Sequence, residues 1–429
     1  MEILFAVVIF TILLVIGVPI VFVIGITAFL AILMMGSVSP VIVFQTMFNS
    51  LDSFILLAVP LFILAANLMN SGKLSEKLIS FTNSLVGHIK GGLAHSNVVV
   101  SMLFGGISGS PVADTAGLGK IFIPNMVKEG YSKGTAIAVT ATSSTMGNII
   151  PPSIGLIIYA SLASTSVGAL FLAGVIPGIL IGLAMMVTIY IQSFKHDYPR
   201  HERVKIKEIF KRFIQILPAL LTPVLIIGGI VLGIATATEA AIIACIYTFI
   251  LGMFFYKNIK WKDIPEILYD TIKLSSAALF ALATAGALAK FLGYFQFSKY
   301  VSVFFSNELG STAIFMAIVV IFFLLIGTFL DATPALYLFV PLVLPASNAL
   351  GIDPILLGIV ITICLSIGLV TPPYGLCLLI ATNIANYKTG RAFMYAIPYV
   401  ISMLVVLVLI IIFPEIATWL PKLLRPDWF

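Results

Sequence analysis

This 429-residue sequence contains few charged residues: Lys, Arg, Asp and Glu together make up 9% of it, whereas 61% is hydrophobic. A soluble globular domain carries roughly a quarter charged residues, so the composition excludes that class. The three cysteines lie in apolar segments without paired spacing, which excludes a disulfide framework. The sequence also lacks the Gly-x-x-x-x-Gly-Lys phosphate-binding motif, so we do not expect ATP to drive the protein directly.

Residues that other functions would need are also missing. The net charge of +6 comes from basic residues spread over several loops, so we expect no nucleic-acid partner. The four histidines lie outside the predicted spans and show no metal-ligand spacing. Hydroxyl side chains within the spans therefore have no histidine base. We expect no enzymatic activity and no organic cofactor.

Apolar runs long enough to cross a bilayer, about 20 residues each, recur along the sequence. They predict an all-α polytopic membrane protein embedded in the lipid bilayer. The first two runs could also form one long helix kinked at Gly17-Val18-Pro19. The predicted spans are residues 3–18, 20–36, 52–70, 132–160, 166–193, 213–233, 238–256, 273–293, 353–386 and 392–413.

Several landmarks occur twice, with residue numbers that differ by 221. Pro151-Pro152 pairs with Pro372-Pro373, Gly106 with Gly327, and Pro124 with Pro345. This regular offset predicts a duplication, with a first repeat at 1–195 and a second at 213–429. A hydrophilic segment, 196–212, would connect them on the cytoplasmic side.

Each predicted repeat contains a hairpin and a broken helix. Segments 93–128 and 312–347 carry Gly, Pro, Ser, Thr and Asp at their centres, which predicts re-entrant helical hairpins. The double prolines break the helices at 132–160 and 353–386. An odd number of crossings in each half inverts the second repeat relative to the first, as in secondary transporters. If both termini face the periplasm, most Lys and Arg residues lie on the cytoplasmic side, which satisfies the positive-inside rule.

The hairpin tips and helix breaks combine oxygen ligands with helix ends. Carbonyl and hydroxyl oxygens suit a small hard cation such as Na⁺, and helix N-termini suit an anion. We expect the tip and the break of each half to meet near the bilayer midplane and enclose a cation. The alternative is that the prolines only kink their helices. The first predicted sodium site comprises Ser108, Ser110 and the backbone carbonyls of Gly147, Ile150 and Pro152.

The 221-residue offset predicts a second sodium site. Phe329 could contribute only its carbonyl, and Thr328 could replace the hydroxyl of Ser108. Asp114 and Asp331 are the only well-placed carboxylates among many hydroxyls and carbonyls, which favours Na⁺ over proton coupling. The second site comprises Gly327, Thr328, Phe329, Asp331, Gly368, Thr371 and Pro373.

Polar residues around the breaks are candidates for contact with an oxygen-rich solute. Two structural alternatives stay open: small hydroxyl residues also join membrane helices, and Asp114 could cap a helix start. Glu239 could likewise only stabilise a helix N-terminus. The predicted solute-binding residues are Asp114, Thr142, Ser143, Ser144, Asn148, Ser153, Pro334 and Tyr374.

Two amphipathic segments, 71–90 and 257–272, connect spans in the two halves. Their apolar and charged residues alternate at helical spacing. This pattern predicts helices lying in the membrane interface.

Two motifs resemble those of the large membrane subunit of tripartite ATP-independent periplasmic (TRAP) transporters. One is Gly106-Ile107-Ser108-Gly109-Ser110 with Asp114, and the other is Gly147-Asn148-Ile149-Ile150-Pro151-Pro152-Ser153. The segment Ala235-Thr236-Ala237-Thr238-Glu239-Ala240-Ala241 is also similar, with Ala237 where the family usually has Pro. The resemblance covers essentially the whole sequence.

This resemblance implies an elevator mechanism, Na⁺ coupling and a location in the bacterial inner membrane. It also implies two partners: a small membrane subunit on a separate chain, and a periplasmic binding protein that delivers an organic acid. The sequence looks most similar to the sialic-acid type. The open alternatives are a TRAP subunit for C4-dicarboxylates, a stand-alone Na⁺-coupled dicarboxylate carrier and a passive channel.

Overall fold

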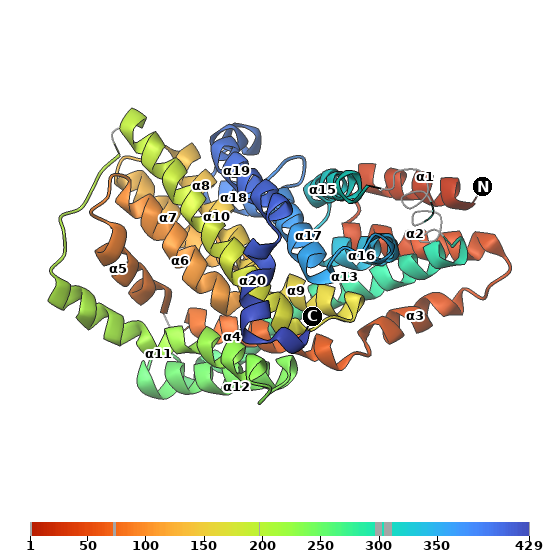
Figure 1. The fold of residues 1–429 in the computed structure, drawn as a ribbon, viewed down its shortest axis with the longest axis horizontal. Helices are drawn as coiled ribbons and strands as arrows, with labels where there is room; N and C mark the ends of the chain where they lie inside the picture. The colour runs from red at the N-terminus through yellow and green to blue at the C-terminus, as the bar shows by residue number, and fades with distance from the viewer. Residues whose placement is uncertain (1, 72–73, 197, 297–302, 304–310, 429) are drawn as a thin grey trace.

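A computed structural model describes residues 2–71, 74–196, 198–296, 303 and 311–428 of the chain, and these residues contain helices and no strands. Eight helices within the described part are long and apolar enough to cross a membrane, among them both arms of the second predicted hairpin. The predicted all-α membrane class is therefore confirmed. The molecule is elongated, with α1–α3 at one end and α5 and the start of α11 at the other (Figure 1).

The helices of the first half are α1 (Glu2–Val15), α2 (Ile20–Met35), α3 (Val41–Leu51), α4 (Ala58–Ser71), α5 (Leu74–Val86), α6 (Gly92–Ser108), α7 (Pro111–Lys128), α8 (Lys133–Ser144), α9 (Ile154–Ala163) and α10 (Val167–His196). Those of the second half are α11 (Ile206–Val231), α12 (Ala237–Ile250), α13 (Ile264–Tyr294), α15 (Thr312–Phe329), α16 (Ala332–Ala349), α17 (Pro354–Gly368), α18 (Leu376–Ala385), α19 (Thr389–Ile412) and α20 (Glu415–Leu424).

The segment 93–128 forms two helices, α6 and α7, joined by a tight turn. Gly109 ends α6 with φ +61°, a left-handed conformation that glycine adopts without strain. Ser110 then caps α7 by accepting a hydrogen bond from the Ala113 N–H, and Pro111 occupies the first turn, where its missing N–H is not needed. In the second half α15 and α16 form the corresponding pair, and α16 begins and ends 221 residues after α7.

Both predicted broken helices are interrupted at their double prolines. The segment 133–163 consists of α8, a 3₁₀ turn at Thr145–Asn148, an irregular stretch and α9. Ser153 restarts the helix by accepting from the Leu156 N–H at 3.2 Å. In the second half α17 ends at Gly368 and α18 begins at Leu376. The peptide bonds Pro151–Pro152 and Pro372–Pro373 are both cis.

The prediction of a separate interfacial helix at 257–272 is wrong. Residues 264–272 are the start of the 31-residue helix α13, which continues without interruption through the predicted span 273–293. Pro265 lies in its first turn, and no proline follows in the helix to break it. The counterpart at 71–90 does contain a separate helix, α5.

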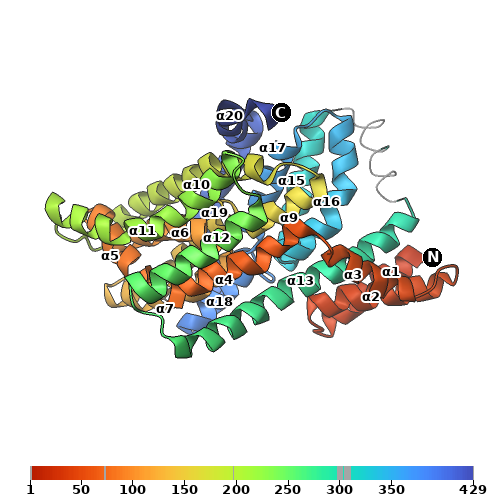
Figure 2. The same cartoon turned by 90° about the horizontal axis from the view of Figure 1, so that it is seen from below.

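The fold also resolves one open alternative and adds two helices that were not predicted. The residues around Gly17 separate α1 from α2, and the two helices pack against each other instead of forming one kinked helix. The unpredicted helices are α3 and α20. Figure 2 shows α13 running along α2, α3 and α4. With α2 and α4, it forms one wall of the central cavity described below.

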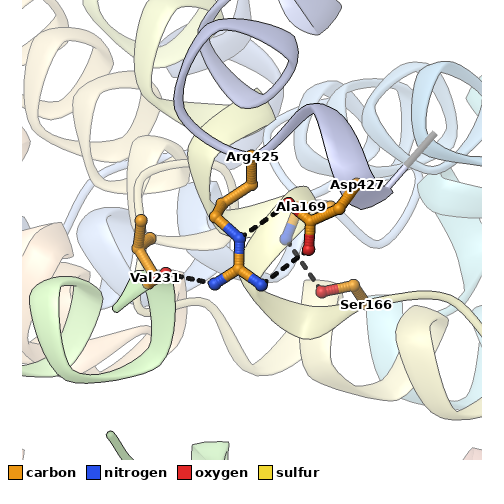
Figure 3. A network of polar contacts seen from close by, with 5 residues as sticks. All are labelled: Ser166, Ala169, Val231, Arg425 and Asp427. Atoms are coloured by element: carbon orange, nitrogen blue, oxygen red, sulfur yellow. Dashed lines mark hydrogen bonds and ion pairs between the residues drawn. The ribbon is translucent and has the colours of Figure 1, made fainter. Parts of the chain in front are cut away.

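The end of the chain is held against the rest of the molecule. The Arg425 guanidinium donates to the Val231 carbonyl at 2.6 Å and forms two hydrogen bonds with the Asp427 carboxylate (Figure 3). These bonds lower the pKa of the Asp427 carboxyl. The Trp428 ring packs against Gly168 at the start of α10. The C-terminal segment therefore connects the beginning of α10 to the end of α11.

Candidate functional site

A cavity of about 330 Å³ lies where the two helix pairs and the two breaks converge. Its lining includes Ser108 and Ser110 from the α6–α7 turn, Asp331 from the α15–α16 turn, and Asn148 and Tyr374 from the two breaks. Residues of α2, α4 and α13 form the remaining wall. The volume is at the lower end of the range typical of small-molecule sites, about 300–1,000 Å³.

In the first half, glycines allow the turn and the break to come into backbone contact. A methyl group at Gly105 would lie 2.8 Å from the Gly147 Cα, and one at Gly109 would lie 2.6 Å from the Pro152 carbonyl oxygen. The Ile154 N–H donates to the Gly109 carbonyl at 3.3 Å. Larger residues would separate the two segments.

The second half repeats this contact with different details. A methyl group at Gly327 would lie 3.2 Å from the Gly368 Cα, and the Tyr374 N–H donates to the Thr328 carbonyl at 3.0 Å. Gly327 and Gly368, both predicted for the second sodium site, are therefore adjacent. In the first half, Ser108 and Gly147 both lie next to the Asp114 carboxylate.

Asp114 is fully buried at the contact between the first turn and the first break. The Ser108 hydroxyl donates a hydrogen bond to one carboxylate oxygen, Oδ1. The other oxygen, Oδ2, is buried and has no hydrogen-bond partner among the described residues. A methyl group at Gly147 would lie 2.7 Å from Oδ2. A buried carboxylate oxygen without a partner is unfavourable, and a cation is the partner that its charge suits.

The position of Asp114 differs from its predicted one at the solute site. It does not line the cavity but lies behind the turn, with the residues predicted to bind the first sodium ion. The reason is helical geometry. Asp114 follows the cap residue Ser110 by one turn, so its side chain points toward the α6 end and the break.

Four of the other predicted solute residues are also absent from the cavity lining. The hydroxyls of Thr142 and Ser144 donate to carbonyls of their own helix, α8, at 2.7 and 2.8 Å. Ser143 bonds to the Ser101 hydroxyl of α6, and Ser153 donates to the Asn148 carbonyl. These contacts agree with the alternative that small hydroxyl residues stabilise and join membrane helices.

Three predicted solute residues do line the cavity: Asn148, Pro334 and Tyr374. The Asn148 side-chain amide donates to the Ser366 hydroxyl at 3.3 Å, which connects the first break to α17 of the second half.

The remaining predicted sodium residues are placed unequally. Pro152 is buried beside the first turn, whereas Pro373 is exposed. The Ile150 side chain packs against Gly178 of α10. Phe329 is 48% exposed. Its side chain has no oxygen, so its participation in a sodium site through the carbonyl stays a prediction.

The two hydroxyls of the second set donate to carbonyls earlier in the chain, Thr328 within α15 and Thr371 from the second break back to α17. Thr328 donates to the Leu325 carbonyl and Thr371 to the Ile367 carbonyl, both at 2.8 Å. Their oxygen lone pairs remain available to a cation.

Glu239 forms a capping box at the start of α12. Its exposed carboxylate accepts from the Thr236 N–H at 2.7 Å, and the Thr236 hydroxyl accepts from the Glu239 N–H. The helix-start alternative is therefore confirmed for this residue.

Asn67, which was not among the predicted residues, lines the cavity from α4. Its amide donates to the Thr271 hydroxyl of α13 at 3.0 Å. A polar residue within the apolar stretch from Phe62 to Met69 was the signal that could have identified it.

Comparison with known proteins identifies the family. The model of the "Tripartite ATP-independent periplasmic transporter, DctM component" matches residues 7–416. The chain is 38% identical to the uncharacterized protein YgiK of Salmonella typhimurium, over 97% of both chains. It is 35% identical to the sialic acid TRAP transporter large permease protein SiaM of Vibrio cholerae, over 88% of this chain and 89% of that one. It is 36% identical to the C4-dicarboxylate TRAP transporter large permease protein DctM of Pseudomonas aeruginosa, over 88% of each.

The fold is similar to that of a solved transporter, YdaH of Alcanivorax borkumensis. The TM-score is 0.60, with 16% sequence identity, over 88% of this chain and 87% of that chain. The family match, the relatives and the fold agree over nearly the whole length. The chain belongs to the DctM component family of tripartite ATP-independent periplasmic transporters.

Proposed function

We propose that this chain is the large membrane subunit of a Na⁺-coupled, binding-protein-dependent importer of an organic acid anion, with sialic acid (N-acetylneuraminate) as the solute. The buried Asp114 Oδ2, which lacks a hydrogen-bond partner among the described residues, is the observation that carries the sodium part. A Na⁺ ion beside Ser108 and Gly147 would supply the missing positive charge. The ion is a co-transported substrate in this proposal.

Helix ends support an anionic solute. The cavity is lined by the first residues of α7, α9, α16 and α18, so four helix N-termini open onto it. Their free N–H groups and partial positive charges favour a carboxylate. None of the described residues that line the cavity is Lys or Arg, so these helix ends would provide the attraction.

The proposed arrangement in the membrane follows the duplication. Repeat 1–195 and repeat 213–429 would have opposite orientations, joined by the cytoplasmic loop 196–212, with both termini in the periplasm. The α6–α7 and α15–α16 pairs would be re-entrant hairpins. In an elevator mechanism, the hairpins and breaks would carry the solute past the wall of α2, α4 and α13.

Two partners complete the proposal: a separate small membrane subunit and a periplasmic binding protein that delivers the solute. The alternatives are a TRAP subunit for C4-dicarboxylates and a stand-alone Na⁺-coupled dicarboxylate carrier. Relatives named for sialic acid and for C4-dicarboxylates have similar identities to this chain, 35% and 36%, which keeps the dicarboxylate subunit as the second candidate.

The test is uptake into proteoliposomes that contain this chain, its small subunit and the binding protein, with and without an inward Na⁺ gradient. Uptake that requires both the gradient and the binding protein supports the proposal. Gradient-dependent uptake without the binding protein would indicate a stand-alone carrier. Uptake that is indifferent to Na⁺ would refute the coupling.

A further inference from the structure

The central cavity has two chemically different sides. The turns and breaks supply serines, an asparagine, a threonine and the Asp331 carboxylate. The opposite wall consists of Ile20 and Val21 near the start of α2, residues 63, 66 and 67 of α4, and residues 274, 277, 278 and 281 of α13. Asn67 is the only polar side chain among the described residues of this wall.

The hydrogen bonds of Thr271 determine the orientation of the Asn67 amide. The Thr271 hydroxyl donates its proton to the Ile267 carbonyl at 2.7 Å. Toward Asn67 it can therefore only accept, and the group that donates to it at 3.0 Å is the Asn67 amide nitrogen, Nδ2. The bond to Thr271 is the one hydrogen bond that the Asn67 side chain forms among the described residues, so the carbonyl oxygen, Oδ1, is free to accept. Asn67 thus offers the cavity an acceptor.

An acceptor on this wall discriminates between solutes by their hydrogen-bond donors. A fully ionised simple dicarboxylate such as succinate has only acceptor oxygens, which would be repelled by Oδ1. A hydroxyl or amide N–H of the solute would instead complete the hydrogen bond. The Asp331 carboxylate across the cavity is a second acceptor with the same preference.

We infer that Asn67 is a specificity-determining residue that accepts a hydrogen bond from a hydroxyl or amide N–H of the solute, so that the cavity selects hydroxylated organic acids over simple dicarboxylates. This inference rests on the proposed function, because it concerns the same solute site. Thr271 is the positioning residue that keeps the amide in the selective orientation.

The test measures solute binding to the purified full-length chain by titration calorimetry in Na⁺ buffer, without the binding protein, whose own selectivity would mask the effect. The probes are succinate, malate and N-acetylneuraminate. Malate is succinate with one added hydroxyl, so this pair isolates the contribution of a single donor.

The unaltered chain should bind malate or N-acetylneuraminate more tightly than succinate. Asn67→Ala should weaken binding of the hydroxylated acids by about threefold to tenfold, as expected for one net hydrogen bond, and leave succinate unchanged. Thr271→Val should allow the amide to rotate and present Nδ2, which shifts preference toward succinate. Asn49→Ala, an exposed change in α3 outside the cavity, is the matched control.

If Asn67→Ala weakens the binding of all three acids equally, Asn67 has a purely structural role and the inference is overturned. An unchanged malate-to-succinate ratio in both variants would also overturn it. If Asn67→Ala does not fold, the ratio in Thr271→Val decides. If the unaltered chain binds none of the three acids while uptake by the complete system still requires Na⁺ and the binding protein, this inference alone is overturned. Failure of that uptake would refute the proposed function.

Discussion

The Ser108 hydroxyl donates a hydrogen bond to the Asp114 carboxylate, and this bond joins the end of α6 to the first turn of α7. It occupies one carboxylate oxygen and leaves the other, Oδ2, next to Gly147 of the first break. Three segments that are separate in the sequence therefore meet at a single carboxylate.

Asp114→Asn should abolish Na⁺-dependent uptake while the protein still folds. The change retains the shape of the side chain but removes the charge that would bind the ion. Loss of one partner from a buried charged pair costs roughly 2–5 kcal/mol, so Na⁺ affinity should fall by at least about 30-fold. The Na⁺ dependence of uptake in proteoliposomes measures this. Unchanged Na⁺ affinity would remove Asp114 from the sodium site.

Asp331→Asn should have a different effect, because Asp331 lines the central cavity, which is the proposed solute site. We expect weaker solute binding as well as weaker Na⁺ dependence. Titrating solute at several fixed Na⁺ concentrations separates the two effects. If Asp331→Asn changes the Na⁺ affinity alone, the Asp331 carboxylate does not contact the solute.

Gly147→Ala should destabilise the protein and abolish uptake. The added methyl group would lie 2.7 Å from Asp114 Oδ2, a distance that forces the buried carboxylate away from the break. Overpacking of this kind costs about 1–3 kcal/mol. Gly228→Ala in α11 is the control, since a methyl group there meets nothing within 4 Å. Thermal unfolding of both variants in detergent tests the expectation, which fails if they unfold at the same temperature.

Arg425→Ala should lower the unfolding temperature by several degrees, because the C-terminal segment loses its bonds to Val231 and Asp427. Arg203→Ala is a suitable control, because it removes the same charge from an exposed position in the connecting loop. Equal unfolding temperatures for the two variants would show that the contact contributes no stability.

The same contact has a predictable pH dependence. Arg425 lowers the folded-state pKa of Asp427 below its ordinary value of 3.8. The contact therefore stabilises the protein fully above the ordinary pKa, and this contribution is lost as the pH falls through the lowered value. The difference in unfolding temperature between the unaltered chain and Arg425→Ala should therefore shrink below pH 3.8, leaving the part that is due to the Val231 bond. A difference of the same size at neutral and low pH would contradict this assignment.

Much of the architecture was predictable because helix breaks have local causes. Gly109, Ser110 and Pro111 specify a turn wherever they occur together, and the double prolines cannot continue a helix. The continuity of α13 was not predictable from its amphipathic start. The charged residues there suggested an interface, but the backbone has no reason to stop before Tyr294.

The site was less predictable, because side-chain direction depends on packing. Thr142, Ser143 and Ser144 are close in sequence to the first break, yet α8 and its neighbours enclose them. Asn67 is far from every predicted motif and reaches the cavity only because α4 packs beside α13. Proximity to a motif in sequence was therefore a poor guide to the cavity lining.

The two halves place their carboxylates at different depths. Asp114 is enclosed behind its turn, while Asp331 faces the cavity, where a dissolved ion can reach it directly. In the proposed function, an ion for Asp114 would have to pass between the packed turn and break, so it would bind more slowly than an ion for Asp331. Rapid-mixing kinetics would then show a slow phase for the ion at Asp114 and a fast phase for the ion at Asp331.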